Sequence, residues 1–320
     1  MNNQDSGAPS RWRVIAAFAA VYSIWGSTYL AIRFAVQTIP PFLMAGTRFV
    51  IAGALLYAWL RLRGTPAPTR SQWRATAIVG GLLLMGGNGV LAWAEQTVPS
   101  GLAALMIATV PVWMVLLEWL RGDGTRPTTG VVIGLVLGLV GIVLLVGPAN
   151  LAGGNSISTV GVIALIFAAL SWATGSFYAR HAPLPAASLM GTGMEMIAGG
   201  VLLLAAGALT GEFGQLRLDQ VSPRSLAAVG YLIVFGSWVG FSAYTWLLRA
   251  VKPALSSTYA YVNPVVAVFL GWALAGEALT VQTLLAAAII IAAVVITTTN
   301  QSRKKIPELT EAVPGIVQAE

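Results

Sequence analysis

The 320-residue chain contains no cysteine, one histidine and few charged residues. Without cysteine there is no disulfide framework and no thiolate chemistry, and one histidine excludes a Cys/His zinc site, so we expect no metal and no cofactor. Charged residues make up 9% of the chain and hydrophobic residues 57%, against about 25% and about 45–50% in ordinary soluble domains. This composition excludes a soluble globular protein.

Stretches of about 20 apolar residues, enough to cross a hydrocarbon core of about 30 Å, recur along the whole chain. Short connections rich in proline and glycine separate them. The ten predicted membrane-spanning helices are residues 14–34, 42–62, 73–95, 99–120, 129–147, 157–180, 186–208, 225–248, 254–275 and 280–299. We therefore expect an all-α membrane protein in a lipid bilayer, with terminal tails at 1–13 and 300–320.

The positive charges are distributed unevenly between the two sides of this topology. With the N-terminus in the cytoplasm, fourteen Lys and Arg residues fall on the cytoplasmic side, and three, Arg33, Arg217 and Arg224, fall outside. This bias follows the positive-inside rule and predicts a multi-pass inner (plasma) membrane protein with both termini cytoplasmic. Because the net charge of +7 encodes topology, we do not expect nucleic acid as a partner.

The two halves of the chain resemble each other. Residues Trp25 to Arg33 recur loosely as Trp172 to Arg180, and Trp93 recurs as Trp246, 153 residues later. The repeats are residues 14–147 and 157–299. Each holds five spans, an odd number, so equivalent helices run in opposite directions, as in transporters with inverted repeats around a central cavity. Chance similarity between Ala- and Leu-rich helices is the alternative, but the span count agrees with the repeat.

On these features the chain resembles the drug/metabolite transporter superfamily, EamA type. The resemblance covers residues 14–299 and rests on Trp25 to Ser27 with Tyr29, Arg48-Phe49, the segment Pro99 to Pro111, Pro264, and the segment Gly276 to Thr280. It implies a ten-helix inner-membrane exporter of metabolites, amino acids or drugs, with a cavity lined by helices 1, 3, 4, 6, 8 and 9. The first half departs from the pattern, with Gly122-Asp123-Gly124 where the second half has Gly276-Glu277.

Aromatic and polar side chains share helix faces within the spans, and a cavity needs both a stacking surface and a few hydrogen-bonding groups. The predicted substrate-binding residues are Tyr22, Trp25, Tyr29, Asn88, Trp93, Met106, Thr109, Trp113, Trp172, Ser176, Trp238, Ser242, Trp246, Tyr259 and Asn263. For the aromatic residues the alternative is an interfacial belt at the lipid headgroups. For Asn88 and Asn263 the alternative to substrate binding is a hydrogen bond between helices.

Four charged residues within or near the spans bear on the mechanism. Glu195 lies near the middle of the seventh span, where an unpaired carboxylate is costly, so it is the candidate for proton coupling. Arg48 lies inside the second span and is expected to snorkel outward or pair with a carboxylate. The alternative is that both are structural. Glu95 and Glu118 are expected at solvated helix ends.

A stripe of glycines, Gly130, Gly134 and Gly138, lies on one face of the fifth span. Such a stripe allows two helices to approach closely, either within the chain or in a homodimer.

The residues favour an exporter of small, partly apolar metabolites that works by alternating access, with aromatic or other apolar amino acids as its main cargo. Transport follows a concentration gradient or is coupled to protons. Another cargo class, drug-like or sugar-linked and phosphorylated, is the alternative on the same scaffold. An intramembrane enzyme needs paired catalytic groups at one depth. The sequence offers no such pair, so no catalytic residue is predicted and the protein is not expected to be an enzyme.

Overall fold

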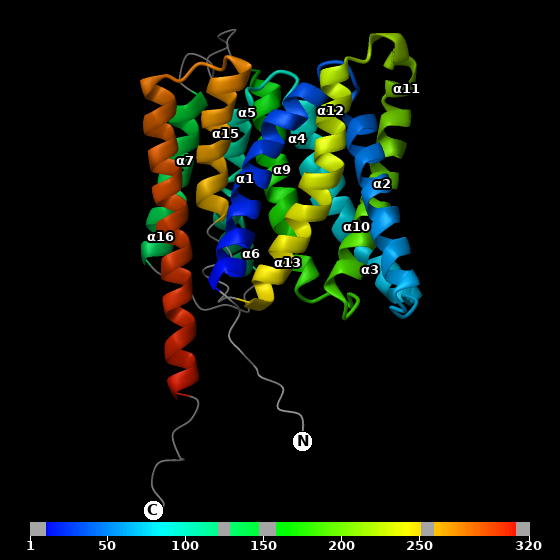
Figure 1. Ribbon diagram of the computed structural model, residues 1–320. Helices are drawn as coiled ribbons and strands as arrows, with labels where there is room; N and C mark the ends of the chain where they lie inside the picture. The colour runs from blue at the N-terminus through cyan, green and yellow to red at the C-terminus, as the bar shows by residue number, and fades with distance from the viewer. Residues whose placement is uncertain (1–10, 121–128, 147–157, 251–258, 312–320) are drawn as a thin grey trace, which may run out of the picture.

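The computed structural model describes residues 11–120, 129–146, 158–250 and 259–311, and every regular element within these ranges is a helix (Figure 1). The helices are α1 (Arg11–Ala35), α2 (Pro41–Leu62), α3 (Arg70–Gly80), η1 (Gly81–Gly89), α4 (Val90–Ala94), α5 (Ser100–Ile107), α6 (Val110–Leu120), α7 (Thr129–Val146), α9 (Thr159–Ala179), α10 (Ser188–Leu209), α11 (Glu212–Gln215), η2 (Leu218–Gln220), α12 (Pro223–Tyr231), η3 (Leu232–Val239), α13 (Gly240–Ala250), α15 (Tyr259–Ala275) and α16 (Val281–Glu311).

Ten apolar helical segments correspond in order to the predicted spans. Six are long and apolar enough to cross a membrane: Arg11–Ala35, Pro41–Leu62, Arg70–Ala94, Thr159–Ala179, Ser188–Leu209 and Pro223–Tyr244. Four are shorter: Ser100–Met114, Val132–Leu145, Val262–Ala275 and Val281–Ile296. The main difference from the expectation is at the end of the chain, where α16 continues to Glu311 instead of ending near residue 299.

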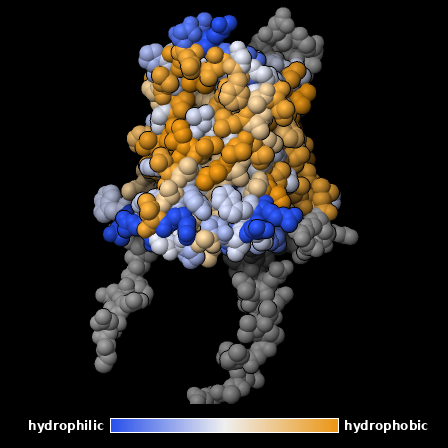
Figure 2. All heavy atoms as spheres, turned by 90° about the vertical axis from the view of Figure 1, so that its right-hand side faces the viewer, coloured by the Kyte–Doolittle hydropathy of each residue, from blue (hydrophilic) through white to orange (hydrophobic). Residues whose placement is uncertain are grey.

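The helices stand side by side as one bundle, and α1 begins at the same end of the bundle at which α16 ends (Figure 1). We call this end the base and the opposite end, where α1 gives way to α2, the top. Figure 2 shows hydrophobic side chains in a broad band between hydrophilic groups at the top and the base. Large apolar residues such as Ile51, Leu55 and Val201 are exposed. A surface of this kind suits lipid and not water.

Equivalent helices of the two halves pack against each other. α2 lies along α10, its counterpart in the repeat, and α7 lies along α16. Glycine makes these approaches close: a Cβ atom built on Gly53 of α2 would lie 2.7 Å from the carbonyl oxygen of Gly193 in α10. Similarly, a Cβ atom on Gly138 of α7 would touch Ala293 of α16 at 3.8 Å. This part of the predicted glycine stripe therefore packs within the chain.

The third and eighth spans share an irregularity that the sequence did not predict. Both contain a π-helical segment, η1 at Gly81–Gly89 in one and η3 at Leu232–Val239 in the other. The two segments occupy equivalent positions in the repeat, so the internal symmetry extends to the backbone geometry. Because π-helical turns rotate the side chains that follow them relative to a regular α-helix, they change which face of the helix points inward.

Two carboxylates cap helices at the top of the bundle. Glu212 accepts hydrogen bonds from the backbone N–H groups of Phe42 (3.2 Å) and Leu43 (2.8 Å), at the start of α2. Glu277 does the same for Ser100 (2.7 Å) and Gly101 (3.0 Å), at the start of α5. A negative group at a helix N-terminus satisfies free N–H groups and favours the helix dipole. These caps fix the top ends of the first-half helices to second-half residues.

Candidate functional site

Four aromatic rings from three helices meet inside the bundle. The ring centroid of Trp25 in α1 lies 5.3 Å from Phe241, 5.0 Å from Tyr244 and 5.2 Å from Tyr259. Tyr244 and Tyr259 are 5.3 Å apart with their planes nearly perpendicular. α13 and α15 supply these partners, so the cluster joins the first half of the chain to the second. Each such contact is weak on its own. A bound aromatic molecule could therefore replace one of these ring contacts at little cost.

The cluster contains two predicted site residues, Trp25 and Tyr259, and two that the sequence analysis missed, Phe241 and Tyr244. We define these four residues as the aromatic cluster. On α13 the prediction had selected Ser242 and Trp246, whose side chains are exposed. The contact residues are their neighbours on the opposite side of the helix.

Asn263 lies one turn along α15 from the cluster. Its side chain is 7% exposed, and its Oδ1 atom is buried without a hydrogen-bond partner among the described residues. α1 approaches closely here, because a Cβ atom on Gly26 would lie 2.6 Å from Cβ of Val266 and 3.2 Å from the carbonyl oxygen of Asn263. Asn263 therefore faces the bundle interior, and its predicted role in substrate binding stays a prediction. An unsatisfied buried acceptor next to aromatic rings suits a ligand that donates a hydrogen bond.

Three further predicted residues lie together in the fourth span. The hydroxyl of Thr109 donates to the carbonyl oxygen of Met106 (2.6 Å), and Nε1 of Trp113 donates to the Thr109 hydroxyl (3.1 Å). The span is interrupted at this point, since α5 ends at Ile107 and α6 begins at Val110. In this conformation the polar atoms of Thr109 and Trp113 therefore bind each other across the break.

The other predicted residues are spread around the bundle. Tyr22, Tyr29, Asn88, Trp172 and Ser176 are half-buried, whereas Trp93, Trp238, Ser242 and Trp246 are exposed. Nε1 of Trp238 donates to the carbonyl oxygen of Ala52 (3.0 Å), which ties η3 to α2. No contact in the described ranges brings Trp93, Ser242 or Trp246 to the aromatic cluster, and their role stays a prediction.

Arg48 lies between α2 and η3 and is 4% exposed. Its Nε atom donates to the hydroxyl of Ser237 at 3.4 Å, and its guanidinium carbon lies 4.4 Å from the ring centroid of Phe49. Within the described part of the chain no carboxylate is within 4 Å of Arg48. The two expected arrangements, snorkelling to the surface and pairing with a carboxylate, are therefore both wrong for the described residues, because the side chain turns inward onto a neutral hydroxyl.

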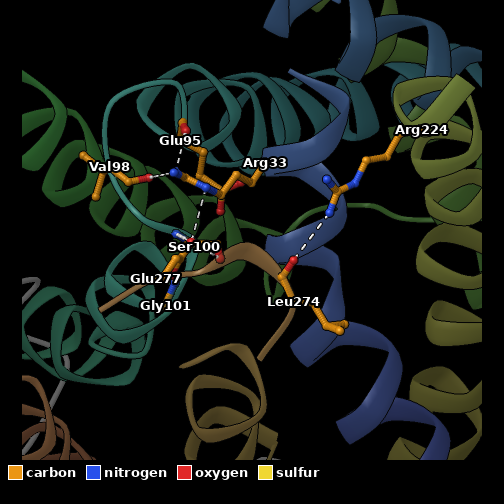
Figure 3. A network of polar contacts seen from close by, with 8 residues as sticks. All are labelled: Arg33, Glu95, Val98, Ser100, Gly101, Arg224, Leu274 and Glu277. Carbon is orange, nitrogen blue, oxygen red and sulfur yellow. Dashed lines mark hydrogen bonds and ion pairs between the residues drawn. The ribbon is translucent and has the colours of Figure 1, made fainter. Parts of the chain in front are cut away.

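Arg33 has a different environment at the top of the bundle (Figure 3). Its Nε atom lies 3.3 Å from the Glu277 carboxylate, and its Nη1 donates to the carbonyl oxygens of Glu95 (3.5 Å) and Val98 (3.3 Å). The same carboxylate accepts a hydrogen bond from the hydroxyl of Ser100 at 2.7 Å. We call Arg33, Glu277 and Ser100 the top cluster. It connects α1, the start of α5 and the α15–α16 turn, where Gly276 has a φ of +67°.

The expectation that Glu95 lies at a solvated helix end is wrong, because its side chain is 1% exposed. Both carboxylate oxygens are buried without a hydrogen-bond partner among the described residues. The helix does end here, after Ala94, but α9 packs against α4, and Arg33 of α1 donates to the Glu95 carbonyl oxygen. The side chain of Glu118, which had the same expectation, lies outside the described residues.

Glu195 lies on α10, where that helix packs against α3. The contact is close because a Cβ atom on Gly80 would lie 2.5 Å from the carbonyl oxygen of Glu195. The Glu195 side chain is half-buried, and no ion pair joins it to a cation within the described ranges. The structure therefore contains two acids of interest, and the more deeply buried one is Glu95.

Comparison with known proteins decides the class of this molecule. A model of the EamA-like transporter family matches residues 11–147 and matches again over residues 159–299. The chain belongs to the EamA-like transporter family. The two matches confirm the resemblance predicted from the sequence and the two-repeat architecture, with one family unit on each half.

Relatives of this EamA-like transporter point to the same class. It is 44% identical to the uncharacterized inner membrane transporter YedA of Escherichia coli (strain K12), over 83% of this chain and 84% of the relative. It is 28% identical to the protein PecM of Dickeya dadantii, over 80% and 82% of the two chains. A crystal structure with 22% identity and a TM-score of 0.61 covers 92% of this chain and 99% of that one, which shows the fold alone. The protein is thus a multi-pass membrane transporter.

Proposed function

We propose that this EamA-like transporter exports small organic metabolites by alternating access, and that amino acids with aromatic or other apolar side chains are its main cargo. The observation that carries the proposal is the aromatic cluster beside the unpartnered Oδ1 atom of Asn263. Aromatic rings hold an apolar side chain, and the amide oxygen accepts a hydrogen bond from an ammonium group. Because the cluster joins both halves of the chain, a bound molecule contacts both halves.

We propose that the base of the bundle faces the cytoplasm. The positive-inside bias supports this orientation. The chain has no cysteine, so single cysteines at the exposed positions Ala67 in the base and Gln215 in the top give clean labelling sites. A membrane-impermeant maleimide should label the Gln215→Cys variant in intact cells and the Ala67→Cys variant only after lysis.

Counterflow in proteoliposomes tests the cargo. Vesicles loaded with unlabelled phenylalanine, leucine, methionine or alanine are diluted into trace labelled phenylalanine, and uptake above that of empty liposomes is measured. We expect accelerated exchange with the first three and little with alanine. Exchange of a drug-like cation or a sugar phosphate, without exchange of any amino acid, would favour the alternative cargo class.

The same proteoliposomes, with a pH gradient across the membrane, test whether transport is coupled to protons. If the gradient drives net flux, either Glu195 or Glu95 is the acid that carries the dependence. Replacement of each by glutamine separates them: the variant whose flux no longer responds to the gradient identifies the acid. A response that survives both substitutions would remove both acids from the mechanism.

A further inference from the structure

Arg48 is a buried charge with no counter-ion among the residues that the structure describes. An arginine side chain stays protonated in proteins, so burial cannot be relieved by loss of its proton. A buried cation normally has an anionic partner, because removal from water is otherwise uncompensated. Arg48 is 4% exposed, and its described hydrogen bond goes to the neutral hydroxyl of Ser237 at 3.4 Å.

The described groups around Arg48 do not include an anion that would compensate its buried charge. The ring of Phe49 lies 4.4 Å from the guanidinium, but an aromatic face is a much weaker partner than a carboxylate. Glu195, the acid on the equivalent helix of the other half, forms no ion pair with it in the described structure. The guanidinium therefore retains donors for which the described residues offer no anion.

Arg48 lies close to the helix that carries Trp25 of the aromatic cluster. It lies seven residues into α2, about 10 Å along the helix from the top. It faces η3 of the second half. A Cβ atom on Gly236 would lie 3.2 Å from Cγ2 of Thr28 and 3.7 Å from Nη2 of Arg48. Gly236 of η3 therefore lies between Arg48 and Thr28 of α1. α1 also carries Trp25 of the aromatic cluster, one turn from Thr28.

We propose that Arg48 binds the carboxylate of the transported molecule, in a subsite next to the aromatic cluster. The inference rests on the proposed function and narrows its cargo to molecules with one carboxylate and an apolar body. Ser237 holds the guanidinium in place until a carboxylate replaces this weak bond with paired, charge-assisted hydrogen bonds. A single arginine matches one carboxylate, whereas a phosphorylated cargo with two charges needs further cations.

Ligand-induced thermal stabilisation of the purified protein in detergent tests the subsite directly. Phenylacetate is compared with phenethylamine, which has the same ring and a cation in place of the anion. We expect phenylacetate to raise the Tm of the wild type and of Arg48→Lys, and to leave the Tm of Arg48→Gln unchanged. Arg33→Gln is the matched control: it lowers the starting Tm but keeps the phenylacetate shift, because Arg33 already has Glu277 as its partner.

Counterflow with labelled phenylalanine is run on the same variants. We expect Arg48→Gln to raise the half-saturation concentration about tenfold or more, since hydrogen bonds to charged groups are stronger than neutral ones. If Arg48→Gln exchanges phenylalanine like the wild type, or if phenylacetate shifts its Tm equally, the inference is overturned while the transport function stands. If the phenylacetate shift depends on Arg48 but no amino acid is exchanged, the carboxylate subsite stands and the amino-acid cargo is wrong.

Discussion

Arg33 and Arg48 stand fifteen residues apart at the start of the same repeat, yet they have opposite surroundings. Arg33 lies beside a carboxylate at 3.3 Å and donates to two backbone carbonyl oxygens. Arg48 is more deeply buried and has a neutral hydroxyl at 3.4 Å. The comparison separates a charge that holds helices together from a charge that is available to a ligand. The first has an anionic partner in the structure, and the second has none among the described residues.

Loss of the Glu277 carboxylate should give the largest effect on stability. Glu277→Ala leaves the N–H groups of Ser100 and Gly101 and the guanidinium of Arg33 without their acceptor. Breaking such a partly buried pair costs about 3 kcal/mol. The expected result is a clear fall in Tm in detergent. Glu277→Gln retains the shape and part of the capping, so it should lose less. An alanine variant as stable as the wild type would show that the top cluster contributes nothing to the fold.

Replacement of each arginine by methionine should change stability in opposite directions. Arg33→Met removes the ion-pair partner of the Glu277 carboxylate and is expected to lower the Tm. Arg48→Met removes an uncompensated buried charge at similar volume, which is neutral or stabilising by about 1–2 kcal/mol. The measurement is thermal unfolding of both variants in the same detergent. A loss of stability in both would mean that Arg48 has a structural partner after all, and the contrast between the two sites would disappear.

The aromatic cluster should affect cargo binding, and comparison of two variants separates this effect from the loss of packing that any Trp25→Ala change causes. Trp25→Ala removes the central ring of the cluster, and Trp25→Phe keeps an aromatic surface at that place. Loss of about 1.4 kcal/mol of aromatic contact corresponds to an increase of about tenfold in the half-saturation concentration of phenylalanine counterflow. The phenylalanine variant should stay within about threefold of the wild type. Equal flux in the wild type and the alanine variant would place the cargo elsewhere.

These residues also show what the sequence could and could not predict. Trp25 and Tyr259 were found because each shares a helical face with other aromatic or polar residues at regular spacing. Phe241 and Tyr244 were missed because η3 precedes them, and its π-helical turns rotate the following residues away from the face that α-helical spacing predicts. Glu95 was placed at a solvated end because the sequence marks where the helix stops. It does not show that α9 packs against α4 at that end. Tertiary packing of distant segments decides such cases.

Glu95 supplies the smallest predicted effect, a dependence of stability on pH. Glu95 follows Ala94, the last residue of its span. Burial raises the pKa of its carboxyl well above the usual value, the nearby charge of Glu277 raises that pKa further, and Arg33 lowers it in part. A raised pKa in the folded state means that the stabilising contribution is present at low pH and is lost as the pH rises through that pKa.

The Tm of the wild type should therefore fall as the pH is raised above the usual titration range of carboxyl groups. Glu95→Gln, which is neutral at every pH, should show a flatter profile. Asp219→Asn, which changes an exposed acid, is the control and should follow the wild type, because Glu95 retains its carboxyl in that variant. If Glu95→Gln keeps the full slope, another group titrates, and the buried carboxyl near the top cluster does not respond to protons in this range.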